Sequence, residues 1–230
     1  MPDERIAPLP TKEARDRLRA VVDAAIATIP YGGGALQILF DEVLQPNFDK
    51  RREEWLKKLA EVLEELRARM EGFDPASLES NEQFVSAVSQ ATRIAMGTHR
   101  QEKLEMLKDS LVNLVIRGAS SDLLLARFLR FIDELEPEHF LVLKYLSSPE
   151  KWYADQGIPK GSIYMGAPKA IMDGARLPVS GAQLDLVLGD LDSNGLARTG
   201  SLGTMMTEQG VWQPMSTDLG NQLLGFVIKQ

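Results

Sequence analysis

A long amphipathic helix is the feature of this sequence that most limits how the chain can fold. Between Asp49 and Gly72 apolar side chains recur every three or four residues, and Arg, Lys and Glu that can pair along the helix fill the other positions. The apolar stripe consists of Trp55, Leu59, Val62, Leu66 and Met70. Such a helix must bury its stripe, so it predicts the core of an all-α unit. The alternative is a contact face for a protein partner or a second copy of the chain.

The pattern stays helical up to residue 135, and no strand pattern occurs before residue 136. Further helices are predicted over 12–29, 35–44, 82–114 and 123–135. Gly97 lies inside the third of these and predicts a kink or break, because glycine weakens a helix interior. Residues 1–10 contain three prolines and predict a disordered or extended arm. Residues 11–135 are therefore predicted to form an all-α helical bundle.

The pattern changes in residues 136–230, which predict a second domain of mixed helix and short strand. Its expected helices cover 138–146, 169–175, 180–194 and a last segment that begins at Thr217. Short strands are expected over 196–199 and 211–215, joined by a glycine-bearing excursion over 200–210. Residues 147–168, rich in Pro and Gly, are expected to be mainly loop.

This order of helices and strands, over roughly residues 137–228, resembles the winged-helix module of many bacterial regulators. In those proteins a Gly-Leu pair closes the third helix, as Gly195-Leu196 does here, and a T-x-x-G segment opens the last helix, as Thr217 to Gly220 does here. The resemblance implies the fold and not an activity. The predicted fold class is thus mainly α, with an N-terminal helical bundle followed by a winged-helix-like α+β module.

The N-terminal domain resembles a family of bacterial helical proteins of uncharacterised function. Three segments carry the resemblance: Ile29–Gly33, Arg51–Leu56 and Asn81–Leu107. Some proteins of this kind are encoded near phage-defence genes, so the resemblance implies a link to bacterial phage defence. It implies no catalytic residue.

Charge argues against the DNA-binding function that a winged helix would suggest. The helix over 180–194, which would enter the DNA groove, carries Asp185, Asp190 and Asp192 and has no Lys or Arg. DNA readers neutralise phosphates mainly with those cations. The candidate nucleic-acid contacts nearby are Lys169, Arg176, Gln183 and Arg198. The chain has a net charge of −7, and both its N-terminal and its C-terminal part are acidic. DNA binding is therefore retained only as an alternative.

An uncharged apolar segment of seventeen residues, 24–40, is the candidate for membrane activity. A spanning helix needs about 20 apolar residues, and this segment is interrupted at its centre. The interruption consists of Pro30, Tyr31, Gly32, Gly33 and Gly34. The segment is expected to form a tight hairpin in the domain core, with insertion into a membrane as the alternative.

No combination of side chains predicts catalysis. The chain has no cysteine, and its two histidines, His99 and His139, lack metal-ligand spacing. Ser148 and Lys151 match S-x-x-K, but Pro149 follows the serine and predicts a turn or helix cap. We therefore expect a non-enzymatic interaction, regulatory or accessory protein without metal, cofactor or small-molecule substrate. Because the N-terminus lacks the apolar region of a secretory signal, the expected location is the cytoplasm.

Overall fold

The structure is a computed structural model that describes residues 45–118, 121–161 and 163–229. The predicted arm, the two helices over 12–29 and 35–44, and the apolar segment 24–40 lie outside the described residues. The chain divides into two compact units, the first ending at Asp133 and including Lys229, and the second covering Glu134–Ile228. The described residues are mainly helical and contain a single two-stranded sheet.

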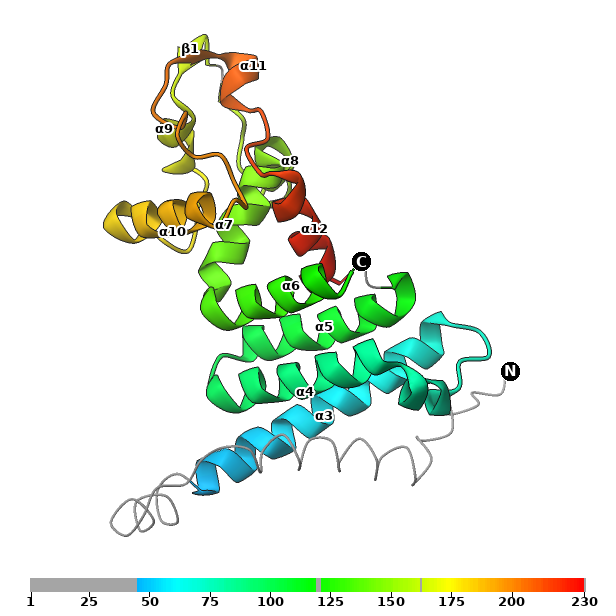
Figure 1. The fold of residues 1–230 in the computed structure, drawn as a ribbon. Coiled ribbons are helices and arrows are strands. Elements are labelled where there is room, and N and C mark those ends of the chain that lie inside the picture. Colours follow the sequence, from blue (N-terminus) through cyan, green and yellow to red (C-terminus); the bar gives the residue numbers. More distant parts are fainter. Residues whose placement is uncertain (1–44, 119–120, 162, 230) are drawn as a thin grey trace, which may run out of the picture. The chain divides into compact units, whose positions relative to one another are not determined.

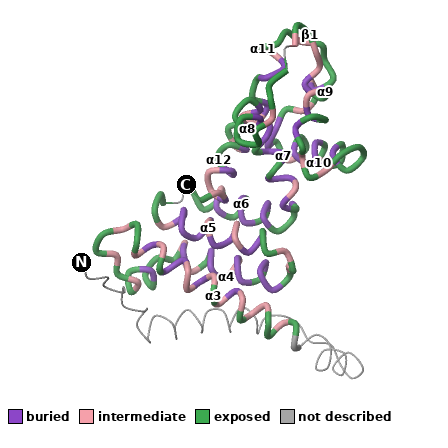
Figure 2. The backbone as a smooth tube through the Cα atoms, turned by 180° about the vertical axis from the view of Figure 1, so that it is seen from behind, coloured by how far each residue is buried: buried purple, intermediate pink, exposed green. Residues whose placement is uncertain are grey.

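Unit 1 is a layered helical bundle. Its elements are α3 (Gln45–Arg69), the 3-10 helix η2 (Pro75–Ser80), α4 (Glu82–Gly97), α5 (Gln101–Arg117) and α6 (Asp122–Glu134). Figure 1 shows α4 and α5 running side by side, with α3 crossing both and α6 on the other side of α5. Figure 2 marks buried residues along α3, α4, α5 and α6.

Local sequence signals set the helix ends in unit 1. The Asn81 side chain accepts a hydrogen bond from the Phe84 N–H at 3.0 Å and so caps the start of α4. The helix stops at Gly97, where the sequence predicted a kink or break, and α5 restarts at Gln101. Gly118, with φ +74°, follows the last residue of α5.

Unit 2 is built around α7 (Pro137–Ser147). Three helices pack against α7: α8 (Pro149–Asp155), α10 (Gly181–Ser193) and α12 (Asp218–Val227). The remaining elements are β1 (Met165–Gly166), α9 (Pro168–Met172), β2 (Met206–Thr207) and α11 (Glu208–Val211). Val142 and Leu143 of α7 are fully buried, which makes this helix the centre of the unit's core.

The strand predictions for unit 2 are wrong, and the loop-rich segment 147–168 contains a helix that was not predicted. The segment expected to be mainly loop contains α8, because Pro149 occupies the first turn of a new helix. The expected return strand over 211–215 does not form, since Val211 ends α11. The expected strand over 196–199 is reduced to one antiparallel bridge, Ala197 with Ser216. The sheet instead pairs β1 with β2, Met165 opposite Thr207 and Gly166 opposite Met206.

The Gly-Leu pair and the T-x-x-G segment contact each other directly. Gly195 has φ +70° and lets the chain turn at the end of α10. The Thr217 hydroxyl donates to the Gly195 carbonyl at 2.7 Å and accepts from the Gly220 N–H at 3.1 Å, while the Thr217 N–H donates to the Leu196 carbonyl at 2.9 Å. A Cβ on Gly220 would lie 2.2 Å from that carbonyl oxygen. The start of α12 therefore rests on the backbone that leaves α10.

Candidate interaction surfaces

The apolar stripe of α3 is part of the interior of unit 1. Trp55, Leu59, Val62 and Leu66 are almost completely buried, and Met70 is half-buried. The helix packs on α4 and α5 through this face. The structure thus places the first four residues in the core, and they offer no free surface to a partner.

A buried hydrogen bond fixes the tryptophan of this stripe. The Trp55 indole N–H donates to the Thr92 hydroxyl of α4 at 2.9 Å, and that hydroxyl donates to the Val88 carbonyl at 2.7 Å. Both side chains are fully buried. A buried indole needs such an acceptor, so Thr92 sets the register of α3 against α4.

The polar edge of the α3–α5 contact carries a cluster of alternating charges. Lys58 lies 2.6 Å from Glu105 and 3.0 Å from Glu61, and Lys108 lies 2.9 Å from Glu105. Burial raises the pKa of Glu105, but hydrogen bonds from Lys58 and Lys108 outweigh that effect and hold its pKa below the ordinary value. Burial likewise lowers the pKa of Lys58, and the two carboxylates outweigh it and raise this pKa. The paired charges join two helices, and nothing in their arrangement favours proton transfer.

The aspartates of α10 each have a partner inside unit 2. Asp190 accepts from His139 Nε2 at 3.1 Å, and Asp192 accepts from the backbone N–H of Thr199 at 2.8 Å. Asp185 pairs with Lys169 at 2.5 Å. The acidity of this helix therefore has structural causes: two of the three carboxylates hold neighbouring elements in place.

The His139–Asp190 pair joins the start of α7 to α10. His139 Nδ1 accepts from the Glu136 N–H at 3.2 Å, which leaves the hydrogen on Nε2 to be donated to Asp190. Both ring nitrogens are thus engaged in hydrogen bonds within unit 2. His139 is largely buried near the start of α7, and the other histidine, His99, is exposed between α4 and α5.

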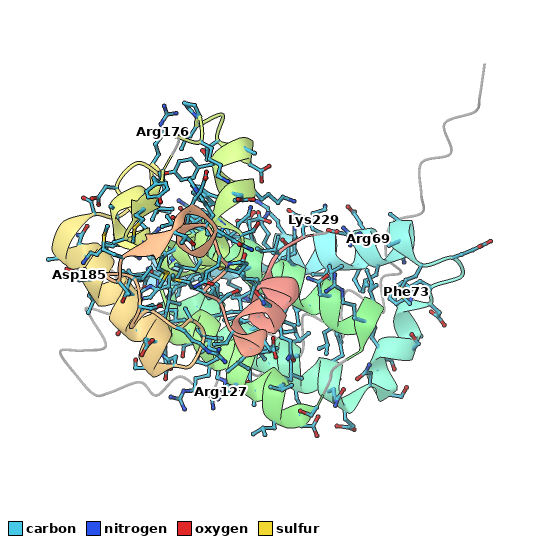
Figure 3. The ribbon with its side chains drawn as sticks, turned by 90° about the horizontal axis from the view of Figure 1, so that it is seen from above. Arg69, Phe73, Arg127, Arg176, Asp185 and Lys229 are labelled. Atoms are coloured by element: carbon cyan, nitrogen blue, oxygen red, sulfur yellow. The ribbon has the colours of Figure 1, made fainter. Side chains whose placement is uncertain are left out.

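The predicted nucleic-acid contacts do not form a cationic surface. Lys169 is neutralised by Asp185, and Arg176, Gln183 and Arg198 are exposed. In Figure 3 Arg176 points away from the unit at one edge and does not face Asp185 on α10. Dispersed cations next to an acidic helix are a poor match to a phosphate backbone.

An exposed apolar ribbon in unit 2 was not anticipated from the sequence. It consists of Tyr164 and Met165 at β1 and Met205 and Met206 at β2, and we call it the Tyr-Met ribbon. Tyr164, Met165 and Met205 are 93%, 53% and 60% exposed. Figure 2 shows the chain around β1 as exposed or half-buried. Single exposed apolar side chains are common, but a group of three on one short sheet forms a patch.

One face of the Tyr-Met ribbon is tightly packed. A Cβ on Gly166 would lie 3.2 Å from the Ile163 side chain and 3.9 Å from that of Val211, and a Cβ on Gly210 would lie 2.9 Å from the Met206 Cβ. Side chains alternate along a strand, so Met165 and Met205 share the face opposite Met206. One face of the ribbon is thus anchored on α11, and the other presents two thioethers to solvent.

Aromatic side chains support the base of this region. The rings of Tyr153 and Trp212 meet edge-on with centroids 4.9 Å apart, and the Lys160 ammonium lies 5.0 Å above the Trp212 ring. The Tyr153 hydroxyl donates to the Ile171 carbonyl at 2.5 Å, and burial raises the pKa of this tyrosine. These contacts join α8, α9 and the segment after α11.

The described residues contain no group of three or more His, Asp or Glu side chains that could hold a metal ion. Ser148 precedes the first residue of α8, as the predicted turn or cap requires, and its side chain makes no capping hydrogen bond. The expected hairpin from Pro30 to Gly34 lies outside the described residues.

Comparisons of the chain with protein-family models, with curated proteins and with solved structures find no match. Among the helices of residues 45–118, 121–161 and 163–229, none combines the length and the apolar character needed to cross a bilayer.

Proposed function

We propose that this chain is a non-enzymatic interaction protein that binds a protein partner through the Tyr-Met ribbon of unit 2. The observation that carries the proposal is the exposure of Met165 and Met205 on the sheet face opposite the packed one, together with the exposed Tyr164 just before β1. Tyrosine offers a rigid amphipathic contact, and methionine adapts to an irregular partner surface. The unit acts as a rigid support for this patch.

The arrangement of unit 2 supports a winged-helix-like module in which the wing carries the patch. The helices α7, α9, α10 and α12 follow the winged-helix order, and the Thr217–Gly195 contact joins the two motifs on which the resemblance rests. In this interpretation residues 198–215 occupy the place of the wing. The resemblance of the N-terminal domain adds an accessory role in bacterial phage defence to the proposal.

Charge favours a protein over a nucleic acid as the partner that binds the Tyr-Met ribbon. Residues 163–167 and 200–208 contain no Lys or Arg, and Glu208 adds a negative charge at the end of β2. A wing that contacts DNA would need cations at these positions. The net charge of −7 acts in the same direction, and it also disfavours an anionic bilayer. Binding of DNA by α10 remains the alternative, because its place in the order of helices is that of a reading helix.

Site-specific photo-crosslinking in the source cells tests the proposal. A photoreactive residue at position 205 should give discrete crosslinked protein species, while the same residue at Leu123, a still more exposed site in unit 1, should not. In the M165S/M205S variant the photoreactive residue is placed at position 164, and these crosslinked species should be lost. Equal crosslinking at 205 and 123, or none at 205, would refute the proposal.

Light scattering after gel filtration distinguishes a second copy of the chain from a different partner. A dimer that dissociates in the M165S/M205S variant identifies the occupant as a second copy. A mobility shift of DNA that weakens steeply with salt, and that the double variant retains, would instead favour the DNA alternative.

A further inference from the structure

Unit 2 contains a cavity that none of the functions above uses. It lies between α7, α8 and α12, three helices that Figure 1 shows close together, and has a volume of about 360 Å³. This volume is at the lower end of the range of small-molecule sites, roughly 300–1,000 Å³. Leu224 and Ile228 of the C-terminal segment contribute apolar lining, and most of the other lining side chains are polar.

Two lysines that pair with no described residue line this cavity. The other lysines of the described part of the chain each pair with a carboxylate or, for Lys103, donate to a backbone carbonyl. Lys144 of α7 and Lys151 of α8 make no such contact with any described residue, and both line the cavity. In an acidic chain, two ammonium groups left together create a local positive field that attracts an anion.

Neutral donors complete the polar lining of the cavity. The Ser148 side chain has no capping hydrogen bond, so its hydroxyl can donate to a ligand. The Asn221 carbonyl accepts from the Ser216 hydroxyl at 2.7 Å, which leaves the amide hydrogens of Asn221 for another acceptor. The Trp152 indole N–H is used, since it donates to the Ala175 carbonyl at 2.8 Å.

One carboxylate also lines the cavity and limits the choice of ligand. Asp155, on α8, forms no ion pair with a described residue and reduces the charge of the lining to a net +1. A ligand with negative charge alone would be repelled by it. A ligand that carries both an anionic group and hydroxyl groups could place the anion at the lysines and donate a hydroxyl to Asp155.

We infer that this cavity binds a hydroxyl-bearing phosphate monoester, such as a sugar phosphate. Two ammonium groups, a hydroxyl and an amide supply more donors than the two oxygens of a carboxylate can accept, and they match the three oxygens of a phosphate ester. Such an ester carries a charge of about −1.5 to −2 near neutral pH, so the net +1 of the lining attracts it. Lysine is a common phosphate ligand that acts as a point charge. The inference is independent of the proposed function.

Calorimetric titration of the full chain at low ionic strength tests the inference with ribose 5-phosphate, AMP, inorganic phosphate and ribose as probes. Ribose 5-phosphate should bind, ribose should not, and rising salt should weaken the binding. The relative affinities of ribose 5-phosphate and AMP decide whether the ligand is a sugar phosphate or a nucleotide. Binding of inorganic phosphate alone would overturn the hydroxyl-bearing class.

Variants tie the binding to the cavity. Replacement of both lysines, K144Q/K151Q, should weaken ribose 5-phosphate by about tenfold or more, because hydrogen bonds to charged groups are lost. Asp155→Asn should leave phosphate recognition intact and weaken the preference for the hydroxyl-bearing ester over inorganic phosphate. Lys57→Gln, which alters an exposed lysine of α3, is the matched control and should bind like wild type.

Amide chemical shifts of the wild-type chain provide a second measurement that does not depend on how the variants fold. Ribose 5-phosphate should shift the resonances of residues 144–155 and 221–228. The inference is overturned if wild type binds none of the phosphate probes, if K144Q/K151Q binds as tightly as Lys57→Gln, or if the shifts lie elsewhere.

Discussion

Substitution of Gly220 by alanine should destabilise unit 2, although alanine is the better helix former. Elsewhere in a helix the change from glycine would stabilise by about 1 kcal/mol. Here the new Cβ would lie 2.2 Å from the Leu196 carbonyl oxygen and 3.2 Å from a methyl of Leu143. The oxygen is a backbone atom that accepts a hydrogen bond from the Thr217 N–H, so it cannot move aside alone.

The size of the effect follows from what must shift. Relief of the clash requires α12 to move away from the turn after α10, and overpacking of this kind costs about 1–3 kcal/mol. Weakening of the Thr217 hydrogen bonds adds about 1 kcal/mol for each bond lost. We therefore expect the free energy of unfolding to fall by roughly 2–4 kcal/mol.

Urea unfolding followed by circular dichroism measures this change. Gly189→Ala is the matched control, because Gly189 lies within α10 and a Cβ there would meet no atom within 4 Å. The control should be as stable as wild type or more stable by up to about 1 kcal/mol. If Gly220→Ala is as stable as Gly189→Ala, the close approach of α12 to Leu196 is not a feature of the folded protein.

Three further predictions concern single positions. Thr92→Val should lower the free energy of unfolding by about 1–3 kcal/mol in urea titrations, because it leaves the buried Trp55 indole N–H without an acceptor; an unchanged midpoint would contradict this. The pKa of Glu105 is lowered, so its stabilising effect is present above its ordinary value of 4.5 and is lost as the pH falls through the folded-state value. On acidification, Glu105→Gln should therefore lose less stability than wild type, and the difference should be about 1 kcal/mol or less because the side chain is partly exposed. Thermal melts across that pH range measure the difference. If the melting temperatures of the variant and wild type fall equally with pH, the Lys58–Glu105 contact does not contribute to stability. Gly195→Val should lower the melting temperature, because a side chain at a φ of +70° costs about 1–2 kcal/mol of folding free energy. An unchanged melting temperature would indicate that the turn after α10 has a different conformation.

Helices with strong local signals could be predicted from the sequence. The helix expected over 180–194 is observed as Gly181–Ser193, because Gly195 marks its end. Thr217 caps α12 as its T-x-x-G context predicts, since its hydroxyl accepts from the Gly220 N–H. These features depend on residues close together in the chain, and local chemistry is sufficient to place them.

Elements that depend on distant partners could not be predicted. The strands β1 and β2 are two residues long, show no alternation of their own and lie about forty residues apart in sequence. The Tyr-Met ribbon follows from their pairing, and an exposed "YM" or "MM" cannot be told from a buried one by pattern alone. In the same way, the partners of Asp190 and Asp192 appear only once α10 is packed in place.

The three tryptophans are distributed so that each unit carries its own fluorescent probe. Trp55 is buried in unit 1, and Trp152 and Trp212 are buried in unit 2. Emission from a buried indole shifts to longer wavelength when water reaches it, so a Trp55→Phe chain would report the melting of the C-terminal unit alone. A W152F/W212F chain would report the N-terminal unit, and the two curves together would measure how strongly the halves cooperate in folding.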